Sequence, residues 1–142
     1  MLHVQKLDPR AKLPTVANPG SDLGYDLYSL LHVVLEPKSL TKVRTGIAVQ
    51  FTDARMGGLL RDRSSMASKG ITVSAGVIDA GFTGELLVLL TNTTDRSIQI
   101  NADDKIAQMI PIVALTHQEV IEVKEVLQRD NRGAQGFGSS GR

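Results

Sequence analysis

With 142 residues, a formal net charge of +1 and no cysteine, the chain is long enough for one domain with a substantial core. The small net charge argues against duplex nucleic acid or an anionic membrane surface as partner, and the lack of cysteine excludes disulfides, thiolate nucleophiles and cysteine-based zinc sites. The three histidines do not have the spacing of metal ligands. The sequence shows neither a signal peptide nor an apolar run near the roughly 20 residues that a membrane span needs. We therefore expect a soluble, cytoplasmic protein.

Short apolar runs separated by turn residues follow one another along the chain, a pattern typical of β-strands. Strands are predicted at residues 4–7, 25–30, 32–35, 40–43, 47–51, 86–91, 98–100 and 106–115. The predicted breaks lie at residues 18–20, 36–37, 57–58, 79–81 and 101–104. Many short strands at this spacing indicate a sandwich or a barrel.

One short helix is predicted over residues 64–69, where Ser64 or Ser65 could cap the N-terminus and Gly70 could end the helix. Residues 119–127 are ambiguous, because their apolar spacing allows a helix while their β-branched content favours a strand. Pro111 lies inside a predicted strand, so we expect a sheet edge or a bulge there.

The segment 76–85, Gly-Val-Ile-Asp-Ala-Gly-Phe-Thr-Gly-Glu, places Asp79 after two apolar residues and before a glycine turn. A carboxylate held at the edge of a sheet and aimed outward suits a general base. Aspartate is also common in tight turns for purely structural reasons, so this segment alone leaves both interpretations open.

Three further segments place polar side chains where a β-core does not favour them. Residues 61–67 put Arg63 and two serines at the predicted helix start, which suits a phosphate group but also an ordinary surface helix. Asp26 lies between strand-like apolar neighbours and needs a partner or a hydrated ion. Gln108 lies in an apolar strand, where its amide needs a hydrogen-bond partner and could be purely structural.

The C-terminal segment 132–141, Arg-Gly-Ala-Gln-Gly-Phe-Gly-Ser-Ser-Gly, has no apolar periodicity. Its glycines leave backbone amides free to bind an anion, its serines add hydroxyl donors, and Phe137 could stack on a planar base. The segment is therefore either a flap that orders over a nucleotide or a disordered end or cloning remnant.

Taken in chain order, the five segments resemble the five motifs of the homotrimeric dUTPase family, and the likeness extends over residues 20–141. The matching segments are residues 24–27, 63–67, 76–85, 104–110 and 132–141. The resemblance implies an all-β, jelly-roll-like (β-clip) subunit with one short helix, assembled as a homotrimer. It also implies a β domain over residues 1–128 and a flexible, glycine-rich C-terminal arm over residues 129–142 that closes over the active site.

The resemblance further implies hydrolysis of dUTP to dUMP and pyrophosphate with magnesium as cofactor, a reaction that keeps uracil out of DNA and supplies dUMP for thymidylate synthesis. Asp79 matches the carboxylate that activates the water attacking the α-phosphorus. Asp26 matches an acidic residue that contacts magnesium through water, while the direct metal ligands are mainly substrate phosphates. Arg63 and Gln108 complete the expected catalytic set, as contacts to the phosphates.

The expected substrate-binding residues form four groups: a phosphate-binding turn, a hairpin that contacts the uracil edge, a ring that packs on deoxyribose, and the arm. In this order they are Ser64 and Ser65; Val73, Gly76, Val77 and Ile78; Phe82; and Arg132, Phe137, Gly138, Ser139 and Ser140. The expected partners are dUTP and further copies of this chain, with neither nucleic acid nor membrane.

Four positions depart from the usual family pattern. Phe82 replaces a tyrosine, Thr83 an arginine, Asp62 a proline and Gln135 a glycine. Asp62 adds a negative charge beside the expected phosphate site, so weaker triphosphate binding is expected. Gln135 would strain the closed arm if this position needs a positive φ.

Three alternatives to the dUTPase interpretation account less well for the sequence. A dCTP deaminase of the same superfamily needs a glutamate where this chain has Leu89, which cannot transfer protons. A non-catalytic binding module of the same fold should have lost the water-activating carboxylate or the tail, and both are present. A structural β-trimer with an accidental tail does not explain why Arg63, Asp79 and Phe137 occur together.

Overall fold

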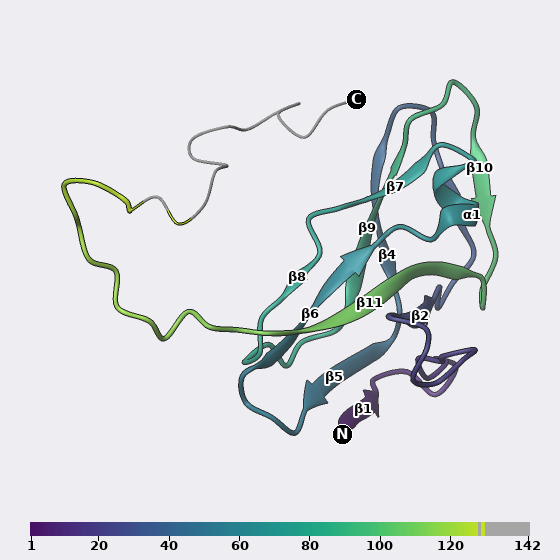
Figure 1. Ribbon diagram of the computed structural model, residues 1–142. Coiled ribbons are helices and arrows are strands. Elements are labelled where there is room, and N and C mark those ends of the chain that lie inside the picture. Colours follow the sequence, from purple (N-terminus) through teal and green to yellow (C-terminus); the bar gives the residue numbers. More distant parts are fainter. Residues whose placement is uncertain (128, 130–142) are drawn as a thin grey trace.

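The computed structural model describes residues 1–127 and 129, and within them the chain forms strands and a single short helix (Figure 1). The strands are β1 (Leu2–Lys6), β2 (Tyr25–Tyr28), β3 (Val33–Leu35), β4 (Leu40–Arg44), β5 (Ile47–Phe51), β6 (Met56–Arg61), β7 (Ile71–Ser74), β8 (Val77–Ile78), β9 (Leu87–Asn92), β10 (Ile98–Ile100) and β11 (Lys105–Val113). The helix is α1 (Ser64–Ala67). None of the helical residues described forms a segment long and apolar enough to cross a bilayer.

The strands form two larger sheets and two additional pairs. The four-stranded sheet has the order β2-β11-β6-β8, and the three-stranded sheet has the order β4-β9-β7. β1 pairs with β5 and β10 pairs with β3, and every ladder is antiparallel. Figure 1 shows β6 and β11 running side by side through the middle of the molecule.

The hydrophobic core joins the two larger sheets. Leu60 and Met109 enter it from the four-stranded sheet, and Val88 and Leu90 enter it from the three-stranded sheet. Along β9 buried and less buried residues alternate, as expected for a strand with one face on a core. The all-β character predicted from the apolar runs is therefore confirmed.

β6 is a strand that the sequence analysis did not predict, because Gly57 and Gly58 suggested a break. Both glycines lie inside β6 and are buried. A Cβ atom at Gly57 would overlap the carbonyl oxygen of Ile78, and one at Gly58 would lie 2.8 Å from Cγ of Met109. The glycines therefore allow two neighbouring segments to approach closely and do not end the strand.

The helix prediction was partly wrong. The helix is shorter than residues 64–69, and its N-cap is Arg63, which makes no side-chain cap hydrogen bond, so neither serine caps it. Gly70 follows with a φ of +80°, as expected of a residue that ends a helix. Residues 119–127 form neither of the two alternatives considered, and contain no helix or strand.

Pro111 lies where β11 has only one neighbouring strand. It pairs with Gly58 of β6, whereas the pairing of β11 with β2 ends at Met109. This agrees with the expected sheet edge. The irregularity of β11 lies elsewhere, between Lys105 and Ala107 in its pairing with β2.

The chain leaves the sheets after β11, which ends at Val113 instead of continuing to residue 115. The residues that follow run away from the body of the molecule (Figure 1, yellow-green). Several large apolar side chains on this extension are exposed, among them Val120 at 97% and Leu127 at 84%.

Candidate active site

Asp26 lies between two cations that come from different parts of the chain. Its Oδ1 accepts a hydrogen bond from Nε of Arg63 at 3.0 Å, and its Oδ2 lies 2.6 Å from Nζ of Lys105. The Asp26 carboxylate raises the pKa of Lys105 above the usual value of 10.5, because it accepts a hydrogen bond from the Lys105 ammonium group and attracts its charge. The cluster is net positive, with both cations partly exposed.

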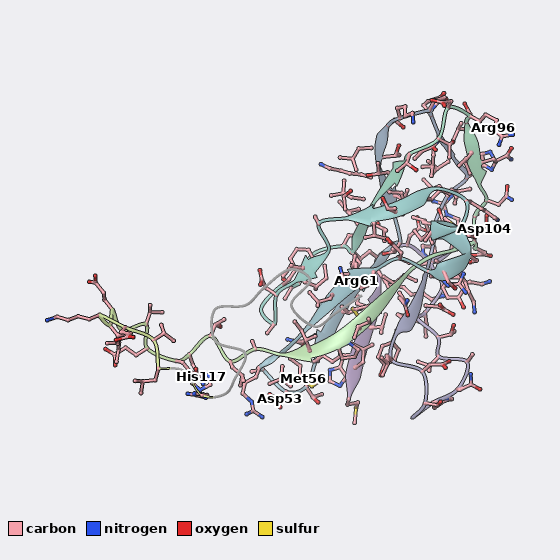
Figure 2. The ribbon with its side chains drawn as sticks, turned by 45° about the horizontal axis from the view of Figure 1, so that its top comes forward. Asp53, Met56, Arg61, Arg96, Asp104 and His117 are labelled. Atoms are coloured by element: carbon pink, nitrogen blue, oxygen red, sulfur yellow. The ribbon has the colours of Figure 1, made fainter. Side chains whose placement is uncertain are left out.

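Strand register brings these residues together. Asp26 on β2 lies opposite Gln108 on β11, which in turn lies opposite Arg61 at the end of β6. Arg63 follows β6 by two residues, and Lys105 begins β11. Figure 2 labels Arg61 and Met56 at the two ends of β6, and the Asp26 cluster belongs to the Arg61 end.

Gln108 is held by the backbone beside this cluster. Its Nε2 donates to the carbonyl oxygen of Asp62 at 2.8 Å. A Cβ atom at Gly24 would lie only 2.6 Å from Oε1 of Gln108, so this close approach requires a glycine. Because an amide nitrogen carries two N–H donors, one donor remains for a ligand.

The two serines of the expected phosphate turn lie next to Arg63. Both residues are exposed, and Nη1 of Arg63 donates to Oγ of Ser65 at 3.4 Å. Ser64 lines a cavity of about 510 Å³ together with Asp26, Arg63, Lys105 and Gln108. Ser65 lines an adjacent cavity of about 400 Å³, which shares Arg63 and Lys105 with the first.

The wall of the larger cavity opposite Arg63 comes from the loop before β2, with residues Ala17, Ser21, Asp22, Leu23 and Gly24. Asp22 stabilises this loop, because its carboxylate accepts the backbone N–H of Asn18 at 2.9 Å. Besides the carboxylates of Asp22 and Asp26, this cavity offers two cations, an amide and a hydroxyl, which are donors suited to a phosphate chain.

Asp79 and Phe82 lie in the turn that follows β8, and neither lines these two cavities. The carbonyl oxygen of Asp79 accepts the backbone N–H of Phe82 at 3.0 Å, so the turn uses the main chain and leaves the exposed carboxylate available. The Phe82 side chain is 41% exposed.

Asp79 and Asp26 belong to opposite ends of the four-stranded sheet. β2 and β8 are its two outer strands, and Ile78 is level with Gly58, three residues before Arg61. With strands about 4.8 Å apart and about 3.3 Å per residue, the two carboxylates are separated by roughly 15–20 Å within one chain. One chain therefore does not bring Asp79 to the cationic cluster.

The segment expected to contact uracil crosses between the two larger sheets. Val73 belongs to β7, which pairs with β9, whereas Val77 and Ile78 form β8, which pairs with β6. In the described part of the chain no ladder joins β7 to β8, so the expected hairpin is not a paired one. Ala75 and Gly76 connect the two strands with φ values of +57° and +95°.

The remaining expected site residues, Arg132, Phe137, Gly138, Ser139 and Ser140, lie outside the described residues. One residue of the cluster, Lys105, was not predicted from the sequence. Its position next to Asp104 in the fourth segment was visible in the sequence, but its ion pair depends on the register between β2 and β11.

The described residues do not form a direct cage for magnesium. They contain no group of three or more acidic or histidine side chains that could hold a metal ion. Both carboxylate oxygens of Asp26 already face cations. This donor set is compatible with a magnesium ion that phosphate oxygens carry.

A family model described as dUTPase matches residues 10–141. The chain belongs to the dUTPase family. Among similar curated proteins, the deoxyuridine 5'-triphosphate nucleotidohydrolase of Mycobacterium marinum is 42% identical over 151 residues, which cover 99% of this chain and 94% of the relative. That of Thermobifida fusca is 39% identical over 144 residues, covering 99% of this chain and 78% of the relative.

Solved structures of dUTPases have the same fold. The Staphylococcus bacteriophage 80alpha dUTPase with dUPNHPP superposes with a TM-score of 0.87 at 30% identity, covering 100% of this chain and 99% of that one. A D95N mutant of the phage phi11 enzyme, described with a structural Mg(II) ion, gives a TM-score of 0.79 at 29% identity over 90% of this chain and 99% of that one. The predicted all-β, jelly-roll-like dUTPase subunit with one short helix is therefore confirmed.

Proposed function

We propose that this dUTPase-family chain hydrolyses dUTP to dUMP and pyrophosphate, and so keeps uracil out of DNA and supplies dUMP for thymidylate synthesis. The observation that carries the proposal is the cavity in which Arg63 and Lys105 flank Asp26 beside the amide of Gln108. Further support comes from the family membership and from the names of the relatives.

Arg63 and Lys105 are proposed to bind the phosphate chain. Arg63 uses Nε for Asp26 and Nη1 for Ser65, which leaves further guanidinium donors for phosphate oxygens. Asp26 holds both cations in place, and Gln108 offers its second amide N–H. Magnesium, when bound to the phosphates, would neutralise negative charge that the cluster alone does not balance, and Asp26 would contact it through water.

Asp79 is proposed to orient and deprotonate the water that attacks the α-phosphorus. It is exposed, it follows β8 in a main-chain turn, and its carboxylate has no part in that turn. Such a base has to lie within hydrogen-bond reach of the water. Because Asp79 lies roughly 15–20 Å from Asp26 in one chain, a complete site needs Asp79 from a second copy.

A homotrimer is the proposed assembly, and exposed apolar surface supports it. On the outer face of the four-stranded sheet, Ile110, Leu59 and Val77 lie side by side on three neighbouring strands, and Val77 is 67% exposed. The extension after β11 exposes more apolar side chains. Surfaces of this kind are typical of contacts between subunits.

Base and sugar selection is proposed to come from the segment between β7 and β8, from Phe82 and from the arm. Val73, Gly76, Val77 and Ile78 would present backbone groups to uracil, and Phe82 would pack on deoxyribose. In the arm, Arg132 would contact phosphate and Phe137 would stack on uracil, with Gly138, Ser139 and Ser140 around the terminal phosphate. The arm would close over the occupied site and exclude water.

The test is to incubate the full-length protein with magnesium and each deoxynucleoside triphosphate or UTP, and to measure pyrophosphate release. We expect release from dUTP alone. A second assay measures ammonia from dCTP, which we expect to be absent. Equal hydrolysis of all nucleotides, or none of dUTP, would contradict the proposal.

A further inference from the structure

Asp62 connects three elements around the candidate site. It lies between the end of β6 and Arg63, and its Oδ1 accepts the backbone N–H of Val73 on β7. Its own carbonyl oxygen accepts the Nε2 donor of Gln108 on β11 at 2.8 Å. One residue thus contacts β7 through its side chain and β11 through its main chain.

The position of β7 explains why a carboxylate is useful there. β7 is an outer strand of the β4-β9-β7 sheet, and among the described strands it pairs with β9 alone. An outer strand leaves alternate N–H groups without a strand partner, and a half-buried N–H group requires an acceptor. The Asp62 carboxylate supplies this acceptor for Val73.

The same hydrogen bond determines where the negative charge of Asp62 lies. The carboxylate faces β7, and Asp62 does not line the 510 Å³ cavity formed by Arg63, Lys105 and Gln108. A residue without a side-chain acceptor at this position could not make this bond.

We propose that Asp62 is a positioning residue for phosphate binding. Its side chain holds the turn at Arg63 against β7, and its carbonyl oxygen orients the Gln108 amide. When the side-chain bond is lost, Arg63 and Gln108 shift relative to the phosphates although both residues are still present. This inference rests on the proposed hydrolysis of dUTP.

The experiment compares Asp62→Asn with Asp62→Ala. Asparagine removes the charge but keeps an acceptor oxygen for Val73, whereas alanine removes both the charge and the acceptor. Asp8→Ala is the matched control, because Oδ1 of Asp8 also accepts a backbone N–H, that of Arg10, and Asp8 lines neither cavity of the candidate site. Each variant is assayed for kcat and KM with dUTP, for thermal stability, and for hydrogen exchange of the Val73 amide.

For Asp62→Ala we expect faster exchange at Val73 and a kcat/KM about tenfold lower, mostly through KM. Asp62→Asn should restore the protection of Val73 and most of kcat/KM. Asp8→Ala should keep the kinetics of the unmodified protein. If Asp62→Ala does not fold, Asp62→Glu replaces it, because glutamate keeps the charge and displaces the acceptor.

The inference is overturned if Asp62→Ala keeps its kcat/KM, with or without a loss of stability. It is equally overturned if the Asn and Ala variants change KM to the same extent. Both variants lack the charge and only Ala lacks the acceptor, so an equal change would mean that the charge of Asp62, and not its hydrogen bond to Val73, affects KM. If the unmodified protein does not hydrolyse dUTP, the proposed function fails. Val73 exchange still tests the bond in that case, and equal protection in the unmodified and Ala proteins overturns it.

Discussion

At the scale of single residues, the main prediction concerns Asp79. Asn at this position keeps the main-chain turn to Phe82 and can still hydrogen-bond a water molecule, but it cannot accept its proton. We expect Asp79→Asn to lower kcat by about 10²–10⁴-fold while affinity for a non-hydrolysable dUTP analogue stays nearly unchanged. Pyrophosphate release and calorimetric titration measure the two quantities.

The matched control for this variant is Asp95→Asn, since the Asp95 side chain is 91% exposed and lines neither cavity of the candidate site. It should keep full activity. Near-normal turnover of Asp79→Asn would mean that Asp79 is only a turn residue.

Lys105 provides the second prediction. Lys105→Met removes one of the two cations that face Asp26, so the cavity lined by Asp22, Asp26 and Arg63 becomes net negative. We expect KM for dUTP to rise about tenfold, with a smaller change in kcat, whereas Lys105→Arg keeps a KM close to that of the unmodified protein. An unchanged KM in Lys105→Met would show that the phosphates do not bind at this cluster.

The pH dependence of this cluster follows from the raised pKa of Lys105. A raised pKa in the folded protein means that the ion pair with Asp26 contributes its full stability below pH 10.5. The contribution is lost as the pH rises through the folded-state pKa. Lys105 therefore stays charged across the neutral range, and any activity change near pH 7 has to come from another group.

At the scale of elements, the contact between β6 and β8 can be tested through Gly57. A Cβ atom at this position overlaps the carbonyl oxygen of Ile78 and lies 3.4 Å from the carbonyl carbon of Asp79. We expect Gly57→Ala to lower the free energy of unfolding by about 1–3 kcal/mol and to displace the Asp79 turn. Urea denaturation measures the stability, and kcat reports the displacement.

Gly81→Ala is the corresponding control, because a Cβ atom there meets nothing within 4 Å. Its free energy of unfolding should change by less than about 0.5 kcal/mol. Equal stabilities of the two variants would mean that β6 and β8 can separate without cost.

The sequence predicts strands that local patterns define, but not strands and ion pairs that depend on contacts between distant segments. Strands such as β5 and β10 were predicted with correct bounds, because their apolar runs lie between clear turn residues. β6 was missed because Gly57 allows a close approach of β8 and Gly58 a close approach of Met109 on β11, and no local pattern contains these contacts. The ion pair of Lys105 with Asp26 was missed for a similar reason, since it exists only once β2 and β11 pair in one register.

At the scale of the whole molecule, a site shared between subunits can be tested by mixing two inactive variants. Arg63→Ala keeps Asp79 intact, and Asp79→Asn keeps Arg63 intact. If each site takes Arg63 from one copy and Asp79 from another, mixed assemblies contain some complete sites. We expect activity to return on mixing, and light scattering of the unmodified protein to give the mass of three copies.

Subunit exchange is verified by co-purification of differently tagged variants, and each variant alone provides the baseline. A mixture that exchanges subunits but stays inactive would place the whole site within one chain. A stable monomer at micromolar concentration would exclude the shared site altogether.

The two-residue connection at Ala75 and Gly76 restricts insertions and deletions between β7 and β8. It joins a strand of one sheet directly to a strand of the other, and both residues have positive φ. An inserted residue there would reverse the faces of β8 and carry Asp79 away from its place, because side chains alternate along a strand. Natural insertions and deletions should therefore be absent between β7 and β8.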